Sequence, residues 1–499
     1  MCIFINKSMS RILIIGPLLL ALLMSYFHYS DTKIGEIARL KQFDLIMATD
    51  EPVKSNDIGI LAIDELAMEK YGQWPWSRDV LANLIWDLRE AGAYEIIVPI
   101  IMTEEDRLGG DMALAEAMVG AQGVIIAQVG SIQIDESKNP VPRGIAKIGD
   151  PLPWLYTWKG MLGPIPILGL NAAGVGVLNT VPEVDGVVRR LPLFMAIGED
   201  VYPSMAIEVM RVEKGIPSAA VKVTEGGISA VRVKGFPVIK GVDSNAQIWL
   251  RWNKEFVSVS AASDDLSLLA GKKVIIGSST SRIGGIIATP NGPAYNWMPA
   301  AVSLQTLLDG DVVQRPYWAS TAELLTTFLL GIFLVVFVRF APYWLIGSMF
   351  ILGAGGLVYG ALYAWTTYLY LLDITIAMST LVLVGLGSTF ARFIYEFKQK
   401  QQIKKQFEHY LDPRQVKALQ KDPTLLKLGG ERKEMSFLFM DIIGFTPISE
   451  YYKNKDDPEG LVVLVNEFLD EMTKIILNNG GMVDKFMGDC IMAVYNAPI

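Results

Sequence analysis

Asp441 ends an apolar run, MSFLFMD, that predicts a buried β-strand. A carboxylate at the end of a strand is open to a metal ion or a phosphate-bearing ligand. The next residues, Ile443 to Thr446, include Gly444 and lead into a helix, so we expect backbone amides there that can bind an anion. This pattern predicts a phosphate-binding turn beside an acidic side chain. Taken alone, Asp441 could also be an ordinary turn residue at a helix entry.

A second acidic residue, Asp489, lies at the tip of a predicted hairpin. The short apolar runs Gly481 to Met487 and Cys490 to Tyr495 are separated only by Gly488 and Asp489. This dipeptide suits a two-residue turn between antiparallel strands. The hairpin would therefore present the Asp489 carboxylate at its end.

The strings around these aspartates resemble class III nucleotide cyclases in order, spacing and chemistry. They are QFEHYLDPRQVKAL from 406, LGGERKEMSFLFMDIIGFTPISE at 428–450, VNEFLDEMTKII at 465–476 and GGMVDKFMGDCIMAVYNAP at 480–498. The resemblance implies that Asp441 and Asp489 are the catalytic carboxylates and hold two Mg²⁺ or Mn²⁺ ions per active site, with the carbonyl of Ile442 as a further ligand. Two ions about 3.5–4 Å apart would activate a 3′-hydroxyl and neutralise triphosphate charge.

The candidate substrate-binding residues are Lys485, Gly444, Phe445 and Thr446. Lys485 stands where adenylate cyclases resemble one another in having lysine and guanylate cyclases have glutamate. An ammonium only donates hydrogen bonds, which suits the acceptor N1 of adenine, so the predicted substrate is ATP. Guanylate cyclase is the alternative within the enzyme class, and Lys485 could also be an exposed strand lysine. Phe445 could contact the base or pack in the core.

The composition of the whole chain indicates membrane-embedded segments and argues against some classes of protein. Hydrophobic residues make up 51% of the 499 residues, and the mean hydropathy of +0.35 points to membrane-embedded segments. The net charge of −8 argues against a nucleic-acid partner. The two cysteines, Cys2 and Cys490, predict no disulfide framework.

Four apolar segments are each close to the roughly 20 residues that a membrane-spanning helix needs. The predicted spans are 12–30, 317–338, 343–362 and 370–393. The first could also be a cleaved signal peptide, but no A-x-A-like site follows it. Asp373 lies at a span boundary, where an interfacial position is favoured over a relay role.

Basic residues set the predicted orientation, because cytoplasmic loops carry excess Lys and Arg. Those flanking the spans include Lys7, Arg11, Arg339, Arg392 and Lys398. These basic residues all lie on the cytoplasmic side of the membrane if residues 1–11 and all residues after 394 are cytoplasmic. The expected protein is therefore a multi-pass protein of the bacterial inner membrane, with residues 31–315 outside and membrane lipid around its spans.

The outer region alternates short apolar strands with amphipathic helices. Between 58 and 128 the order is βαβαβ, which predicts a parallel sheet covered on both faces, and KVIIGSS at 273–279 would complete the sheet late.

Several outer strings are similar to the second type of CHASE sensor domain. They are LKQFDLIMATD at 40–50, AIDELAMEKYGQWPWSR at 62–78, LREAGAYEIIVPI at 88–100, GVGVLNTVPEVDGVVRRLPL at 174–193 and KKVIIGSSTSRIGGIIATP at 272–290. The resemblance implies an extracytoplasmic sensor for an unknown signal. Pro99 and Gly285 depart from positions where the family usually has aspartate, which puts an acidic site there in doubt.

Two outer motifs could bind ligands, but structural interpretations are favoured for both. Trp74 and Trp76 could form an aromatic shelf, although a packed loop is the simpler interpretation. Asp185-Gly186 beside Arg189-Arg190 could bind an anion, although a tight turn with solvated charges is more usual.

A connector at 394–427 precedes the cyclase-like residues. Phe393, Phe397, Phe407 and Leu411 could form an apolar stripe, either on a parallel pair of helices or on a single juxtamembrane helix. The cyclase resemblance implies a homodimer whose active sites lie across the interface.

The predicted protein is multidomain. It has four transmembrane helices, an extracytoplasmic α/β sensor and a cytoplasmic α+β, ferredoxin-like class III cyclase domain of which 428–499 is the N-terminal part. Its predicted function is a receptor adenylate cyclase that converts ATP to cyclic AMP and pyrophosphate.

The family's asparagine, arginine, phosphate-binding lysine and second base-reading residue would follow Ile499. We therefore expect residues 1–499 alone to make almost no cyclic AMP. A non-catalytic sensor that only dimerises is the alternative from another class.

Overall fold

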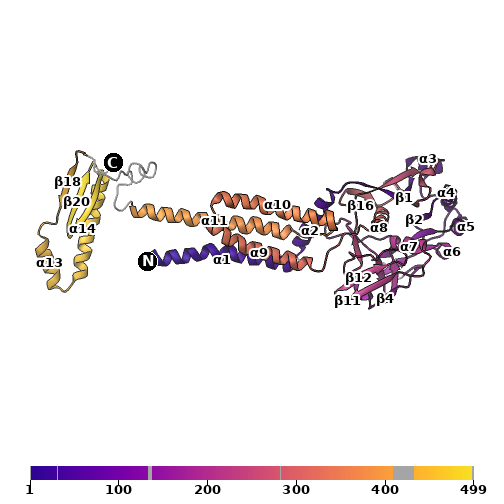
Figure 1. Ribbon diagram of the computed structural model, residues 1–499, viewed down its shortest axis with the longest axis horizontal. Coiled ribbons are helices and arrows are strands. Elements are labelled where there is room, and N and C mark those ends of the chain that lie inside the picture. The colour runs from indigo at the N-terminus through magenta and orange to yellow at the C-terminus, as the bar shows by residue number, and fades with distance from the viewer. Residues whose placement is uncertain (1, 31, 133–136, 281–282, 408–431, 497–499) are drawn as a thin grey trace. The chain divides into compact units, whose positions relative to one another are not determined.

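The computed structural model describes residues 2–30, 32–132, 137–280, 283–407 and 432–496. The chain divides into one unit at 18–385 and another formed by 1–17 and 386–499. Figure 1 labels the elements of both units, which are treated separately below.

The larger unit is built around a mostly parallel sheet, as the sequence predicts. Its strands follow the order β14-β1-β15-β2-β3, with β7 pairing β3 in parallel and β6 pairing β3 antiparallel. The late strand β15 lies between β1 and β2, parallel to both. The strand bounds are β1 Val53–Ile63, β2 Glu95–Ile101, β3 Val124–Ser131, β6 Gly160–Leu162, β7 Gly174–Val177, β14 Lys254–Ser260 and β15 Lys273–Ser278.

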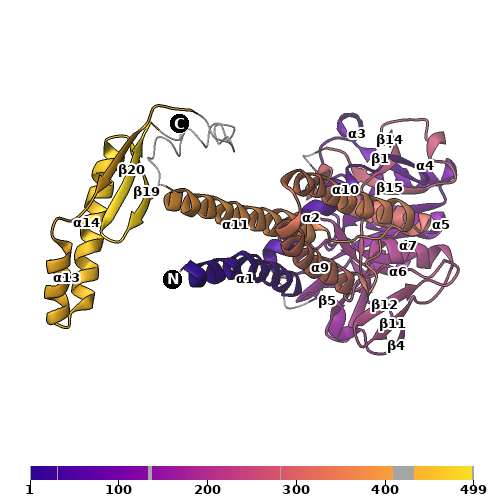
Figure 2. The same ribbon diagram turned by 60° about the vertical axis from the view of Figure 1, so that its left-hand side comes forward.

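Helices cover both faces of this sheet because successive strand side chains point to opposite sides. Ile60 packs into a core with α7 and α8, whereas Leu61 packs into a second core with α4 and α5. Figure 2 labels α4, α5 and α7 around strands β1 and β15 of the sheet. The helix bounds are α3 Glu65–Tyr71, α4 Arg78–Glu90, α5 Asp111–Ala121, α6 Pro166–Asn171, α7 Met205–Glu213 and α8 Met298–Asp309.

Smaller sheets extend this α/β domain. The pairings are β10-β9-β5, β12-β11-β4, β13-β8 and β16-β17. The bounds are β4 Ala146–Ile148, η1 Leu152–Trp154, β5 Tyr156–Thr157, β8 Arg190–Pro192, β9 Phe194–Ile197, β10 Asp200–Pro203, β11 Ala220–Thr224, β12 Gly227–Arg232, β13 Gln247–Trp249, η2 Ser267–Leu269, β16 Ile286–Thr289 and β17 Gly292–Tyr295.

The Trp74–Trp76 segment is a packed loop, as favoured from the sequence. The two indole rings lie 5.4 Å apart edge to face, and Trp76 is buried against Tyr71. The indole N–H of Trp76 donates to the carbonyl of Gly72 at 2.7 Å. These contacts use the ring surfaces that an aromatic ligand shelf would need.

Three described helices are long and apolar enough to cross a membrane. They are α9 Ala319–Phe340, α10 Tyr343–Tyr368 and the part Thr375–Ile403 of α11 Thr375–Phe407. The pair Ile14–Tyr29 and Lys33–Met47, from α1 Cys2–Tyr29 and α2, would add a fourth only if these helices, bent by 76°, form one broken span.

The last of these helices begins at Thr375, five residues after the predicted start of the span. Tyr370 forms a parallel bridge with Gln314, and the backbone amides of Gln314 and Leu371 donate to the carbonyls of Leu369 and Gln314. The Asp373 carboxylate then accepts the amide of Thr375 and caps the helix. Tyr370 and Leu371 therefore form hydrogen-bonded contacts with the segment around Gln314 and are not part of helix α11.

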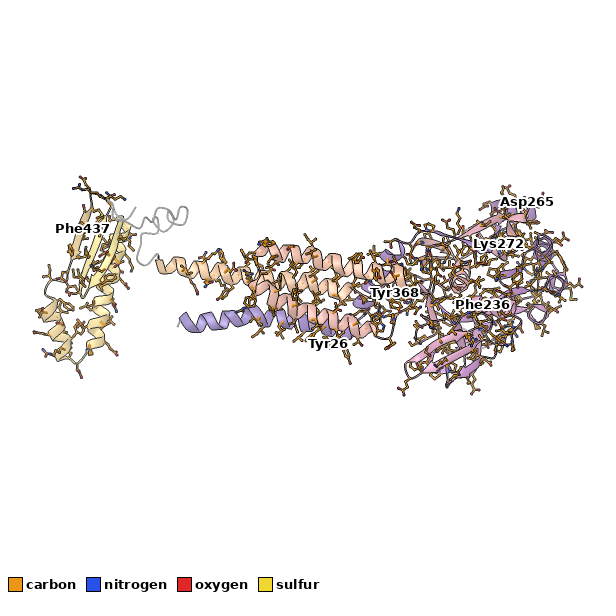
Figure 3. The ribbon with its side chains drawn as sticks, in the orientation of Figure 1. Tyr26, Phe236, Asp265, Lys272, Tyr368 and Phe437 are labelled. Atoms are coloured by element: carbon orange, nitrogen blue, oxygen red, sulfur yellow. The ribbon has the colours of Figure 1, made fainter. Side chains whose placement is uncertain are left out.

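The apolar helices of the larger unit pack on one another. Ala21 of α1, Leu334 of α9 and Leu381 of α11 share one buried cluster. Gly331 allows the close approach, because a Cβ there would lie 2.7 Å from the Cβ of Ala21. Tyr26 and Tyr368, labelled in Figure 3, are more than half exposed near the helix ends that lead into the α/β domain.

The smaller unit contains a three-stranded antiparallel sheet of order β18-β20-β19 with two helices. The bounds are β18 Ser436–Met440, α13 Phe445–Asn454, α14 Pro458–Asn478, β19 Gly481–Met487 and β20 Cys490–Tyr495. Strand β20 lies between β18 and β19, so the chain forms a split β-α-β unit. Phe437, labelled in Figure 3, is 56% exposed on β18.

The predicted connector falls largely outside the described residues. Helix α11 continues to Phe407, and residues 408–431, which include Leu411, are not described. Phe393 and Phe397 stack with ring centroids 6.2 Å apart, and both are about half exposed.

Candidate functional site

The structure brings Asp441 and Asp489 together. Met440 of β18 pairs with Ile491 of β20, and Met487 pairs with Cys490 across the hairpin turn. Asp441 therefore follows β18 next to the turn that carries Asp489. Gly488 has a φ of +70°, which glycine adopts without strain in such a turn. The predicted strand end and hairpin are both confirmed.

The two carboxyl groups are close enough to share a hydrogen bond. This bond with Asp489 is the main reason that the pKa of Asp441 is raised above its ordinary value, and the negative charge of Asp489 adds to the effect. Asp441 and its neighbours on the turn are exposed to solvent. Two ionised carboxylates this close repel each other, and a cation bound between them would relieve the repulsion, so the pair could hold a cation.

These residues fit a magnesium or manganese ion by their chemistry. Both side chains offer oxygen ligands, which such hard cations prefer. Among the described residues, no group of three or more His, Cys, Asp or Glu side chains could hold a metal. Mg²⁺ often binds one or two carboxylates and completes its shell with water and substrate phosphates. The Asp441–Asp489 pair therefore fits an ion that arrives with a phosphate ligand.

The turn after Asp441 is built as predicted but offers fewer amides than the sequence suggests. Gly444, with a φ of +75°, precedes α13. The Phe445 amide donates to the carbonyl of Ile442 at 3.3 Å, and Pro447 has no N–H. Thr446 is exposed and Phe445 half-buried. Two of the first three helical residues thus have no amide for an anion, which weakens the predicted cradle.

Lys485 lies on β19, four residues before Asp489. Its ammonium is 3.7 Å from Asp484, and its side chain is 58% exposed. A shift in the pairing between β19 and β20 falls between Val483 and Lys485. The structure therefore leaves Lys485 open to solvent on the hairpin that carries Asp489.

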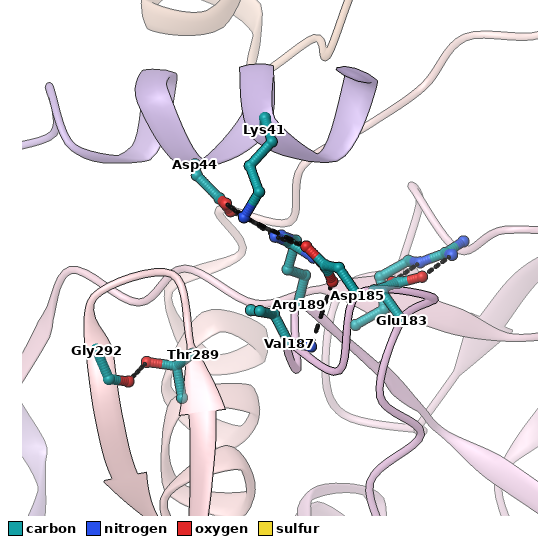
Figure 4. Close-up of polar contacts among 9 residues, drawn as sticks. Lys41, Asp44, Glu183, Asp185, Val187, Arg189, Thr289 and Gly292 are labelled. Carbon is teal, nitrogen blue, oxygen red and sulfur yellow. Dashed lines mark hydrogen bonds and ion pairs between the residues drawn. The ribbon is translucent and has the colours of Figure 1, made fainter. Parts of the chain in front are cut away.

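The prediction that the charges of the Asp185–Arg189 motif are solvated is wrong for Arg189. Arg189 is fully buried rather than solvated. Its Nε and Nη2 donate to the two oxygens of Asp44 at 2.6 and 2.8 Å, and Nη1 and Nη2 donate to Asp185 at 2.8 Å (Figure 4). The Lys41 ammonium lies 3.3 Å from Asp185. The guanidinium is therefore saturated by carboxylates of the same chain.

Asp44 is the residue that sequence reasoning missed. It lies on α2, 145 residues before Arg189. The hydrogen bonds from Arg189 hold the pKa of Asp185 well below its usual range. The cluster joins α2 to the turn at 183–187, and no local sequence pattern could have found a partner so distant.

A second polar cluster lies where α9 and α11 begin. Arg315 donates to Glu323 at 2.7 Å, and Glu323 accepts the backbone amide of Asp373 at 2.7 Å. Gln42 of α2 donates to the carbonyl of Leu372 at 2.6 Å. Asp373 is buried in this cluster, so its role is to tie the start of α11 to the α/β domain.

Comparison with known families identifies the larger part of the chain. A model described as the CHASE2 domain matches residues 18–338, which is more than half of the sequence. The chain belongs to the CHASE2 domain family. The match begins inside α1 and ends inside α9, so the CHASE2 region takes in the helices on both sides of the α/β domain.

Curated relatives are similar over shorter stretches. Adenylate cyclase 1 of Rhizobium meliloti is 34% identical over 68 residues, or 14% of this chain and 10% of the relative. An adenylate cyclase of Anabaena cylindrica is 38% identical over 64 residues, or 13% of this chain and 12% of the relative. An uncharacterized protein of Mycobacterium tuberculosis is 27% identical over 109 residues, or 22% of this chain and 18% of the relative. No solved structure matches the chain significantly.

Proposed function

We propose that this CHASE2 protein is a membrane-bound receptor adenylate cyclase that converts ATP to 3′,5′-cyclic AMP and pyrophosphate. The observation that carries the proposal is the pairing of Asp441 with Asp489 at one end of an exposed antiparallel sheet. The similarity to two proteins named adenylate cyclase supports it. The chain spans only about a tenth of their length, so the activity is a proposal for this protein.

In this proposal Asp441 and Asp489 hold two Mg²⁺ or Mn²⁺ ions together with the carbonyl of Ile442. Bound ions would supply Lewis-acid activation of the 3′-hydroxyl and neutralise charge on the triphosphate. The hairpin and the β18–α13 turn fix the positions of the two carboxylates on separate, hydrogen-bonded strands. Gly444 and Thr446 lie beside them, where a triphosphate would pass.

Lys485 is proposed to select adenine. Its exposed ammonium can donate to an acceptor nitrogen of the base but cannot accept from guanine N–H groups. Phe445, half-buried at the start of α13, is proposed to pack the turn and border the base.

The receptor half of the proposal rests on the CHASE2 region and its apolar helices. We place the α/β domain outside the bacterial inner membrane and residues after 394 inside, because Arg339 lies in the last turn of α9, away from that domain, and because Arg392 and Lys398 follow the apolar residues of α11 in the sequence. Exposed aromatic residues near the domain fit an interfacial belt; they are Tyr26, Tyr29, Tyr317, Trp318 and Tyr368. A homodimer would bring two catalytic regions together, and an unidentified outer signal would control them.

The test is cyclic-nucleotide formation by membranes that contain the intact gene product, with Mg²⁺ or Mn²⁺ and either ATP or GTP. Wild type should form cyclic AMP, and Asp441→Ala should form none above background. Asp470→Ala, at an exposed aspartate on α14 outside the pair, is the matched control and should keep wild-type activity. Equal activity of wild type and Asp441→Ala would favour a non-catalytic dimerisation receptor.

A further inference from the structure

Two cavities adjoin where the α/β domain meets α9. One has a volume of about 550 Å³ and the other about 340 Å³. Both are bordered by Arg39 of α2, Arg315 and Ser320. These three residues therefore form a shared rim between the two spaces.

The larger cavity has walls of both charge signs and two aromatic rings. Its other lining residues include Glu36, Arg190, Asp243, Trp249 and Tyr317. Arg190 is fixed over the Trp249 ring at 5.1 Å and donates to Asp243 at 3.2 Å. Carboxylates beside aromatic rings suit a cation, and hydrogen-bond acceptors suit one that carries N–H groups.

The smaller cavity extends between apolar helices. Phe27 of α1, Leu324 of α9 and Ile376 of α11 contribute to its lining. All three lie on the helices that the proposed function places in the bilayer. The lining also includes polar side chains such as His28, Thr32 and Asp373, so the space is apolar only where it faces Phe27, Leu324 and Ile376.

The rim lies at the level where a bilayer surface is expected. Ser320 is the second residue of α9, and Tyr317, three residues earlier, is 97% exposed. Trp318 and Tyr370 contact each other edge to face at 6.1 Å at the same helix ends. Tyr and Trp favour the interface between lipid headgroups and water.

We propose that these cavities together bind one phospholipid whose headgroup carries a phosphate and a primary ammonium. The phosphate lies at the rim with Arg39 and Ser320, because a guanidinium group matches phosphate oxygens. Arg315 also borders the rim, but both its Nη atoms already donate to Glu323, at 3.2 and 2.7 Å. The ammonium enters the larger cavity toward Glu36 and Asp243. The glycerol and acyl chains leave through the smaller cavity along α1, α9 and α11.

The charge pattern separates this lipid from other phospholipids. Glu36 repels a headgroup that has no positive charge to offset its phosphate, whereas the charge of Asp243 is already balanced by Arg190 at 3.2 Å. A trimethylammonium headgroup has the charge but no N–H to donate to these carboxylates. Phosphatidylethanolamine should therefore bind more tightly than phosphatidylglycerol or phosphatidylcholine. The inference rests on the proposed membrane insertion but not on the cyclase activity.

The experiment is native mass spectrometry of the purified full chain after reconstitution in nanodiscs with equal parts of these three lipids. Wild type should retain one phosphatidylethanolamine per chain. Arg39→Gln should lower this retention by at least about tenfold, whereas Arg39→Lys keeps most of it. Lys33→Gln, on the same helix but lining neither cavity, is the matched control and should bind as wild type does.

Two further variants separate lost binding from lost folding. Glu36→Gln should bind phosphatidylethanolamine and phosphatidylglycerol alike, because it removes the negative charge that favours ammonium. Leu324→Trp should expel the lipid by filling the smaller cavity while leaving every rim charge in place. The thermal unfolding midpoint of each variant should match that of Lys33→Gln.

Soluble competitors distinguish a lipid from a free phosphate ligand. Millimolar inorganic phosphate or phosphoethanolamine should leave the bound lipid in place, because the acyl chains anchor it. Displacement by either competitor would overturn the lipid assignment. So would equal retention of all three lipids by wild type, or unchanged retention by both Arg39→Gln and Leu324→Trp. Failure of the chain to insert into nanodiscs would instead contradict the proposed membrane insertion.

Discussion

The two aspartate pairs of this protein show opposite electrostatics. Asp44 and Asp185 flank a buried arginine, and four hydrogen bonds of 2.6–2.8 Å join them to Arg189. Asp441 and Asp489 lie on two neighbouring turns, the first exposed and the second partly buried, and their mutual contact raises the pKa of Asp441. The first pair is neutralised within the chain, whereas no ion pair to the second pair is found among the described residues.

This difference separates structural charges from candidate functional ones. A buried ion pair costs desolvation energy and is tolerated when hydrogen bonds satisfy its partners, as they do around Arg189. Like charges held close together at a surface destabilise the turn that carries them unless a ligand compensates them. The proposed function assigns an external cation to this role.

Removal of Arg189 should have the largest effect on stability. Arg189→Met leaves Asp44 and Asp185 without their cation and should lower the free energy of unfolding by about 3–5 kcal/mol. Chemical unfolding of the full chain in detergent, followed by tryptophan fluorescence, measures this loss. Arg232→Met, an exposed arginine on β12, is the control and should change little. An equal loss of unfolding free energy in Arg189→Met and Arg232→Met would contradict the conclusion that Arg189 stabilises the Asp44–Asp185 pair.

Neutralising Asp441 and Asp489 should lower activity without lowering stability. Asp441→Asn with Asp489→Asn should lower cyclase activity at least about 100-fold, because the cation ligands are lost. The unfolding midpoint should stay the same or rise, since the repulsion between the carboxylates is relieved. A clear fall in the midpoint would mean that the pair serves folding.

Glu95 is an intermediate case, buried but only partly compensated. Burial is the main cause that raises its pKa to about 8 from an ordinary 4.5, although Lys273 opposes the shift. Its Oε2 accepts no hydrogen bond within the described part of the chain. Between these pH values the folded state binds the extra proton, so stability should fall as pH rises toward 8.

Unfolding midpoints of wild type and Glu95→Gln across pH 5–9 test this expectation. The variant should lack the decline and become the more stable protein above about pH 8, because glutamine carries no charge to bury. The exposed Glu255→Gln should follow wild type. Parallel profiles for wild type and Glu95→Gln would show that Glu95 is compensated like Asp44 and Asp185.

The smallest expected effect concerns base choice. Lys485→Glu should shift the ratio of ATP to GTP turnover toward GTP by on the order of tenfold, because a carboxylate accepts from guanine N–H groups. Initial rates with each nucleotide in the same membranes give the ratio. Lys453→Glu on α13 changes the charge equally and should leave the ratio as in wild type. An unchanged ratio in Lys485→Glu would contradict its assigned role.

The fold was largely predictable because its signals are local. Alternating apolar strands and amphipathic helices predict the parallel sheet, and the late strand KVIIGSS was expected to complete it. Helix α11 starts five residues after the predicted start of the fourth span, because Tyr370 and Leu371 are apolar but bond to Gln314. Apolar composition alone cannot distinguish a membrane helix from a buried non-helical segment.

The candidate sites were likewise predictable where their sequence signals are local. The strand end at Asp441 and the turn at Asp489 are set by short sequence patterns. Arg189 was misread as solvated because its partner Asp44 lies on a distant helix. The limited anion-binding capacity of the α13 turn depends on the Phe445 amide, whose bond to Ile442 is visible only in three dimensions.

The most direct test of the central claim is a count of Mn²⁺ ions bound at the Asp441–Asp489 pair. Electron paramagnetic resonance of the purified protein with Mn²⁺ and a non-hydrolysable ATP analogue gives this number and its dependence on the two carboxylates. The account predicts two nucleotide-dependent ions per site in wild type and their loss in Asp441→Asn with Asp489→Asn. Equal Mn²⁺ binding by the two proteins would contradict it.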